Sequence, residues 1–219
     1  MSTTLSRLLA SHRTLVMGVV NITADSFSDG GAYLDPDAAL AHARQLLEEG
    51  ADILDVGGES TAPTSAGVDA EEESRRVLPV IEALAKDGVY VSVDTYKPEV
   101  ARRALGAGAR MVNDVTAFRG DRSLVDVVAE GDSDVCIMYA KDATPRTTRN
   151  QPVYEDVVIE IAAFLKERTE YAEKHGVNRD RIIIDPGMGA FVSGEPGPRL
   201  EILHRLREFT ELGYPVLVG

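Results

Sequence analysis

Short apolar segments recur along the chain, and longer segments with a helical spacing of apolar residues separate them. The apolar segments cover about 15–21, 52–56, 89–94, 110–113, 135–138, 181–185 and 214–218. Several are apolar throughout, as is typical of strands that are covered on both faces. The helical segments cover about 36–49, 70–86, 98–107, 121–131, 154–176 and 198–212. This alternation predicts a parallel α/β fold.

Proline and glycine mark the boundaries of the predicted helices. Proline suits the first helical turn and glycine the residue after the last turn. The prolines are Pro36, Pro98 and Pro198, and the glycines are Gly50, Gly88, Gly108, Gly176 and Gly213. No linker or low-complexity segment interrupts the pattern, so residues 1–219 are predicted to form a single domain.

Strict alternation of strands and helices favours a (β/α)8 TIM barrel over a doubly wound sheet. No Gly-x-Gly-x-x-Gly motif follows the first strand, which argues against a dinucleotide-binding unit. The pattern provides about seven strands and six helices. We therefore expect the C-terminal βα units of a closed barrel to be missing from residues 1–219, unless a partner completes it or the sheet stays open.

Five apolar segments stop on a carboxylate or carboxamide. These residues are Asn21, Asp55, Asp94, Asn113 and Asp185. The carboxyl ends of parallel strands lie on one face of the fold, and unpaired polar groups there are costly to desolvate. The pattern therefore predicts a polar binding site, with Asp55 expected to anchor the loop that follows it.

Two predicted loops are candidates for ligand binding. The first, residues 21–31, is long for a connection between a strand and a helix, and Phe27 within it is suited to cover a flat ligand. The second, residues 55–63, is rich in glycine and hydroxyl groups. Its backbone amides, Ser60 and Thr61 are suited to hold an anion such as phosphate.

Composition narrows the classes of function. The net charge of −13 argues against partners such as nucleic acid or an anionic membrane. No segment approaches 18 consecutive apolar residues, and the N-terminus lacks the pattern of a signal peptide. The one cysteine, Cys136, lies in an apolar segment and is predicted to be a buried thiol. A cytoplasmic location is expected.

The four histidines fall outside the ends of the predicted strands. A serine–histidine or zinc–histidine site is therefore not expected.

Five sequence segments resemble the dihydropteroate synthase family, across Met17 to Gly219. They are VMGVVNITADSFSDGGAYLD, ADILDVGGESTAP, VSVDTYKPEVARRAL, MVNDV and RIIIDPGMG, in this order. SFSDGG together with GGEST is specific for pterin-binding TIM barrels. The resemblance implies a transferase of folate biosynthesis that joins p-aminobenzoate to 6-hydroxymethyl-7,8-dihydropterin diphosphate, releasing pyrophosphate.

The resemblance also implies a set of pterin-binding residues. Asp94, Asn113 and Asp185 match the family's ligands of the pterin edge, and Val115 and Met138 would contact the ring faces. Carboxylates accept the hydrogen bonds that the pterin amino and ring N–H groups donate, while an asparagine both donates and accepts.

Further residues are implied by the same resemblance around the diphosphate. Asn21 would bind the diphosphate and its Mg²⁺, and Asn21 and Asp94 are the expected catalytic residues. Ser60 and Thr61 would lie by the diphosphate and the aminobenzoate. The first loop, with Asp25, Ser26 and Phe27, would close over the site. The implied reaction needs positioning and charge stabilisation rather than a covalent nucleophile.

The sequence departs from the family pattern at several positions. Ala62 replaces the usual arginine of the second loop, and Tyr139 replaces the usual histidine after the fifth strand. The family's cationic segments on strands seven and eight are not in residues 1–219, so we expect this segment alone to be inactive. Family members pair through their last helices, which implies a possible homodimer of the full-length protein.

Two alternatives stay open at this point. One is a pterin-barrel methyltransferase that uses methyltetrahydrofolate. The other is a paralogue that binds pterins without turning them over.

Overall fold

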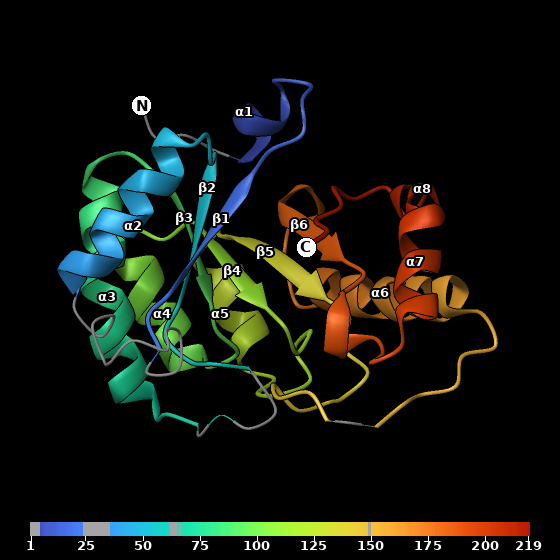
Figure 1. The fold of residues 1–219 in the computed structure, drawn as a ribbon. Coiled ribbons are helices and arrows are strands. Elements are labelled where there is room, and N and C mark those ends of the chain that lie inside the picture. The colour runs from blue at the N-terminus through green and yellow to red at the C-terminus, as the bar shows by residue number, and fades with distance from the viewer. Residues whose placement is uncertain (1–4, 24–35, 62–64, 66, 149) are drawn as a thin grey trace. The chain divides into compact units, whose positions relative to one another are not determined.

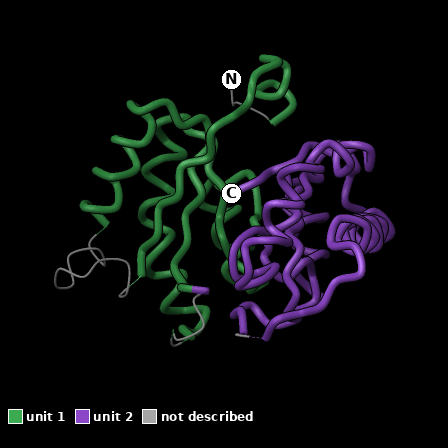
Figure 2. The backbone as a smooth tube through the Cα atoms, turned by 45° about the vertical axis from the view of Figure 1, so that its right-hand side comes forward, with its two compact units in different colours: residues 1–60, 64–113 green, residues 61–63, 114–219 purple. Residues whose placement is uncertain are grey.

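The computed structural model describes residues 5–23, 36–61, 65, 67–148 and 150–219. The chain divides into two compact units (Figure 2). The first unit comprises residues 1–60 and 64–113, and the second comprises residues 61–63 and 114–219. The single domain expected for residues 1–219 stays a prediction.

Parallel strands in chain order form the first unit. The strands are β1 (Met17–Asn21), β2 (Ile53–Gly57), β3 (Tyr90–Asp94) and β4 (Met111–Asp114). The helices are α1 (Leu5–Leu9), α2 (Pro36–Glu48), α3 (Ala70–Lys86) and α4 (Pro98–Gly106). Helices α2 and α3 pack against β1 to β3, and α4 packs against α3 (Figure 1).

The second unit repeats the same alternation. Its parallel strands are β5 (Asp134–Met138) and β6 (Ile182–Asp185). Its helices are α5 (Leu124–Glu130), α6 (Val157–Lys174), α7 (Pro196–His204) and α8 (Leu206–Thr210), with the 3₁₀ turns η2 (Arg179–Arg181) and η3 (Gly189–Phe191). Helix α6 packs against β5, α7 and α8.

The first six predicted strands are confirmed to within two residues, but the seventh is wrong. Residues 214–218 form only an isolated parallel bridge, between Val216 and Ile184. Pro215 lacks an N–H group, so it can only accept, from Ile184 N (3.0 Å). Pairing then continues for a single step, where Leu217 N donates to Ile184 O (2.9 Å).

The last predicted helix is not continuous, and helix α1 was not predicted. The segment 198–212 is divided into α7 and α8 at Arg205, whose backbone leaves the helical region (φ −108°, ψ 22°). Its guanidinium binds Asp156, the N-cap residue of α6, and Glu208. The break therefore coincides with a contact that anchors α7 and α8 to the start of α6.

Side chains of the first unit's strands point to two different faces of the sheet. A valine row faces the helices and is fully buried; its members are Val20, Val56, Val93 and Val112. Gly18 lies on this helix-facing side, because a Cβ there would lie 3.1 Å from Leu46 of α2. Alternate residues of a strand point to opposite faces, so the residues beside the valines point away from the helices.

Glycine ends α4 for a steric reason that the sequence anticipates. Gly108 has φ +110°, and a Cβ there would lie 2.6 Å from the Ala85 methyl group. A side chain is therefore excluded both by the backbone conformation and by the packing against α3.

The predicted buried thiol is confirmed. Cys136 is buried in β5. Over the described ranges, no helix is both long enough and apolar enough to cross a bilayer.

Candidate active site

Three of the predicted polar residues form one row across the first unit. Asn21, Gly57, Asp94 and Asn113 are in register on β1, β2, β3 and β4. A Cβ at Gly57 would lie 3.2 Å from Asn21 Oδ1 and 3.5 Å from Asp94 Oδ2. The two side chains therefore flank a position without a side chain, on the face that points away from the helices.

Asp55 lies one layer below this row, because β2 continues through Val56 to Gly57. It is in register with Ser92 of β3 and is only 4% exposed. Asn113 Nδ2 donates to Asp55 Oδ2 (2.8 Å). The expectation that Asp55 is at a strand end and anchors the second loop is thus corrected: the hydrogen bond joins it to β4.

Burial and hydrogen bonding have opposite effects on the pKa of the Asp55 carboxyl. Burial raises the pKa of the Asp55 carboxyl, and hydrogen bonding from the Ser92 hydroxyl and the Asn113 amide only partly opposes this. Asn113 Oδ1 is buried and accepts no hydrogen bond from the described residues. A buried acceptor without a donor is costly, so this atom is a candidate ligand-binding group.

The second loop is held by a buried cluster of charged residues. Lys97, before α4, hydrogen-bonds both Glu59 of the loop and Glu73 of α3. Tyr96 Oη also donates to Glu59 (3.0 Å). Burial lowers the pKa of Lys97, but the two carboxylates outweigh it and leave the pKa raised. Lys97 therefore stays positively charged, and its ion pair with Glu59 joins the loops after β2 and β3.

The backbone of the second loop also packs closely against helix α3. A Cβ at Gly58 would lie 2.8 Å from Val77 Cγ1 and 3.2 Å from Glu73 O. Arg76 donates to Gly58 O (3.0 Å). The loop thus rests directly on α3, immediately before the half-buried Ser60 and Thr61.

Asp185 ends β6 in the second unit and is 6% exposed. Gly187 N donates to its Oδ1 (2.7 Å). Burial raises the pKa of Asp185 to about 7, and the hydrogen bond from Gly187 only partly opposes this. Gly187 has φ +72°, and a Cβ there would lie 2.3 Å from Tyr139 O, so the turn requires glycine.

Val115 and Met138, the predicted ring contacts, lie in one apolar cluster of the second unit. Ala140 completes the cluster, and Phe191 of η3 packs against it. Phe191 was not among the predicted site residues. Its sequence signal was an aromatic residue shortly after the Asp-Pro-Gly turn of the sixth loop.

Asp114 is a second residue that the sequence did not single out. It is fully buried and accepts from Thr116 N (2.8 Å), Thr116 Oγ1 (2.7 Å) and Phe118 N (2.6 Å). Ala117 and Phe118 have φ of 52° and 60°, a conformation that such residues rarely adopt. Asp114 therefore stabilises a strained turn directly after Val115. In the sequence, Asp114 is one more polar residue at the end of a predicted strand.

Tyr139 makes its contacts within the second unit. Its hydroxyl lies 3.1 Å from the hydroxyl of Tyr154, which donates to Val192 O (2.8 Å). Its ring packs edge-on against Phe164, with centroids 5.1 Å apart. Burial raises the pKa of Tyr139. A neutral tyrosine thus joins the loops after β5 and β6.

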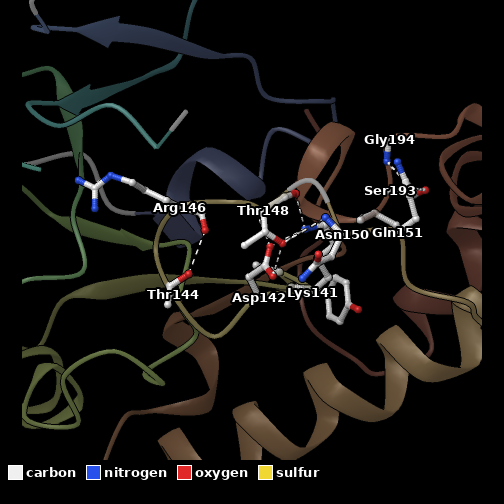
Figure 3. A network of polar contacts seen from close by, with 12 residues as sticks. Lys141, Asp142, Thr144, Arg146, Thr148, Asn150, Gln151, Ser193 and Gly194 are labelled. Atoms are coloured by element: carbon white, nitrogen blue, oxygen red, sulfur yellow. Dashed lines mark hydrogen bonds and ion pairs between the residues drawn. The ribbon is translucent and has the colours of Figure 1, made fainter. Parts of the chain in front are cut away.

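Polar contacts also organise the loop after β5 (Figure 3). Asp142 accepts from Thr148 N (2.7 Å) and Thr148 Oγ1 (2.9 Å), and Lys141 donates to Thr148 O (2.8 Å). Gln151 Oε1 accepts from Ser193 Oγ and Gly194 N, both at 3.1 Å, as Figure 3 shows. The loop is therefore folded on itself and linked to the loop after β6.

Several predicted residues lie outside the described residues. They are Asp25, Ser26 and Phe27 of the first loop, and Ala62 of the second. Among the residues that are described, no group of three or more histidine, cysteine, aspartate and glutamate side chains is arranged to hold a metal ion.

Comparison with known proteins places these features in a family. A family model described as "Pterin binding enzyme" matches residues 17–219. A dihydropteroate synthase of Clostridium beijerinckii is 41% identical over 209 residues, which are 95% of this chain and 74% of that protein. The chain belongs to the dihydropteroate synthase family. Its fold is accordingly the α/β TIM barrel of this family, as the alternation of strands and helices predicted.

Solved structures of family members agree. A Xanthomonas albilineans dihydropteroate synthase with 4-aminobenzoic acid has a TM-score of 0.85 and 46% identity, covering 94% of this chain and 72% of that one. The Xanthomonas enzyme in complex with 7,8-dihydropteroate has a TM-score of 0.80 and 44% identity over the same shares. These relatives carry the synthase name, which favours the synthase over the two alternatives.

Proposed function

We propose that this protein is a dihydropteroate synthase. It condenses 6-hydroxymethyl-7,8-dihydropterin diphosphate with p-aminobenzoate to give 7,8-dihydropteroate and pyrophosphate. The observation that carries the proposal is the row of Asn21, Asp94 and Asn113 in register on neighbouring strands, with Gly57 leaving a space between the first two. The relatives' names and bound compounds support the same reaction.

The proposed pterin ligands differ in what they offer a ring edge. Asp94 and Asn113 of the first unit have acceptor oxygens that suit amino and ring N–H groups, and Asp185 of the second unit has the same kind of acceptor. The buried Asn113 Oδ1, without a donor among the described residues, supports this role. Val115 and Met138, which share one apolar cluster, are suited to contact the ring faces.

The reaction makes a C–N bond at the pterin methylene and breaks the C–O bond to the diphosphate. Positive charge develops on the methylene as the diphosphate leaves. Asp94 is the carboxylate of the row and is suited to stabilise this charge, while Asn21 orients the leaving group. The aniline nitrogen then attacks the methylene and loses one proton, which the released pyrophosphate can accept. No covalent intermediate with the protein is needed.

A magnesium ion fits this arrangement only when it is bound to the substrate diphosphate. Asn21 Oδ1 borders the space above Gly57 and offers one neutral oxygen ligand. The described residues lack a cluster that would hold a metal without substrate. Mg²⁺ retains water and binds substrate phosphates through few protein ligands, which suits a single asparagine. When bound, it would neutralise charge on the leaving pyrophosphate.

We further propose a cytoplasmic enzyme whose partners are its small-molecule substrates. A single buried cysteine and a net charge of −13 support the absence of disulfides and of a nucleic-acid or anionic-membrane partner. Homodimer formation is supported by exposed apolar residues one turn apart on α7: Leu200 is 64% exposed and Leu203 47%.

Ordered binding tests the proposed function. In isothermal titration, pterin diphosphate with Mg²⁺ should bind first, and p-aminobenzoate should release heat only afterwards. A methyltransferase would bind methyltetrahydrofolate in preference, and a non-catalytic paralogue would bind pterin without p-aminobenzoate. Either result would overturn the proposal.

A further inference from the structure

Asp55 makes a hydrogen bond to a strand that is not its neighbour. Its hydrogen bond with Asn113 connects β2 to β4 across the intervening β3. Ser92 lies on β3 in register with Asp55, and it is small enough for the two longer side chains to meet beside it. A pair that spans three strands in a buried layer holds both side chains in one geometry.

The chemistry of the pair determines how the Asn113 amide is turned. Asn113 directs its NH₂ group, rather than its oxygen, towards Asp55, where Nδ2 donates to Oδ2. A carboxylate keeps the amide in this orientation, because it only accepts hydrogen bonds. Oδ1 then points to the other side, where it is buried without a donor from the described residues. The second amide hydrogen remains available on the same side chain.

We propose that Asp55 is a positioning residue that fixes the orientation of the Asn113 amide for pterin binding. Asn113 then presents one acceptor and one donor in a fixed order to the ring edge. Asp55 lies two residues before Gly57 of the row on β2 and acts through Asn113. The inference rests on the proposed function, because it assigns Asn113 to the pterin edge.

The alternative is that the pair only stabilises the interior of the unit. The two roles differ in one measurable respect. If Asp55 acts through Asn113, its removal affects pterin affinity only while Asn113 is present. If its role is only structural, its removal affects binding equally whether or not Asn113 is present.

A double-mutant cycle on the full-length protein separates the roles. The probe is 6-hydroxymethyl-7,8-dihydropterin diphosphate with Mg²⁺, titrated into the wild type, D55V, N113A and the D55V/N113A double variant. D55V should weaken binding about tenfold, because a freed amide loses its orientation. The double variant should bind within about twofold of N113A. Equal losses from D55V in both backgrounds, or no loss in the first, would overturn the inference.

Two further variants keep the test decisive. D55N retains an oxygen that accepts from Asn113, so it should bind more tightly than D55V, and it serves in the cycle if D55V does not fold. D134N removes another buried aspartate, beside Arg181 in the second unit, and should leave pterin affinity unchanged. If D134N weakens binding as much as D55V, loss of stability explains both results, and the inference fails.

The inference and the proposed function can fail separately. If the wild type does not bind the pterin diphosphate, the proposed function is wrong. If the wild type binds it and the cycle is additive, only the role of Asp55 is wrong. Affinity for p-aminobenzoate, measured at saturating pterin diphosphate, should be the same in D55V and the wild type.

Discussion

Asp185 is protonated at mildly acidic pH, because burial raises its pKa to about 7. Below that pH the neutral acid points an O–H group at ligand donors, while above it the carboxylate accepts from them. Pterin affinity should therefore rise about tenfold per pH unit up to pH 7 and then level off. Titration calorimetry from pH 5.5 to 8.5 measures this.

Substitution of Asp185 provides the control for this pH dependence. D185N removes the ionisation, so pterin binding should be weaker and its pH profile flat. A wild-type profile that is flat across pH 7 would contradict the assignment. The same raised pKa also means that this carboxyl's contribution to folding stability is complete below pH 4 and is lost as the pH rises to 7.

Gly57 and Gly58 are neighbours that should respond differently to alanine. A methyl group at Gly57 meets the Asn21 and Asp94 side chains, whereas at Gly58 it meets Val77 and the Glu73 backbone. G57A should weaken binding of the pterin diphosphate about tenfold and change stability little. G58A should lower the free energy of unfolding by about 1–3 kcal/mol. Titration and denaturant unfolding distinguish the two, and the reverse pattern would contradict this assignment.

At the scale of elements, the loops after β2 and β3 depend on one cation. K97M would leave Glu59 and Glu73 close together in a buried site without their shared partner. Removal of one partner from a buried ion pair costs about 3–5 kcal/mol. We therefore expect K97M to lower the unfolding free energy by roughly 3 kcal/mol in urea titrations.

A matched lysine provides the control for K97M. Lys86 is exposed in the last turn of α3, and K86M should change stability by less than about 0.5 kcal/mol. The K97M/E73Q variant should recover part of the loss, because only one charged carboxylate then remains. If K97M is as stable as K86M, the cluster does not hold the loops.

The sequence predicted elements well where a local rule decides them. Apolar segments gave six strands, and the glycine at Gly108 ended α4 as expected. Predictions were wrong where distant contacts decide. The break at Arg205 depends on its contact with Asp156, and the link from Asp55 to β4 depends on its hydrogen bond with Asn113. Neither contact has a signal in the neighbouring sequence.

The same distinction applies to the candidate site. Asn21, Asp94 and Asn113 could be predicted because strand ends in a parallel sheet lie on one face. Asp114 also ends a strand and Phe191 follows the Asp-Pro-Gly turn, but the roles of these two residues, in a strained turn and an apolar cluster, are visible only in three dimensions.

At the scale of the whole molecule, the net charge of −13 favours mutual repulsion of surface carboxylates. Salt screens this repulsion. Raising KCl from 0.02 to 0.3 M should stabilise the protein by about 1 kcal/mol, or roughly 2–4 °C in Tm. Calorimetric melting curves measure the change.

A charge variant tests whether repulsion is the cause. E82K/E170K changes two exposed glutamates of α3 and α6 and makes the protein four charges less negative. Its Tm should rise less with KCl than that of the wild type. An equal rise would show that salt acts by another route.

The row from Asn21 to Asp94 also sets a limit on the width of a bound group. Neighbouring strands are about 4.8 Å apart, so the Asn21 and Asp94 backbones lie roughly 10 Å apart along the sheet. Their side chains converge above Gly57, because a Cβ there would lie 3.2 Å from Asn21 Oδ1 and 3.5 Å from Asp94 Oδ2. Inhibitors that carry a bulky group at this point will engage only one of the two side chains, whereas a slender linker against the bare backbone of Gly57 lets one compound engage both.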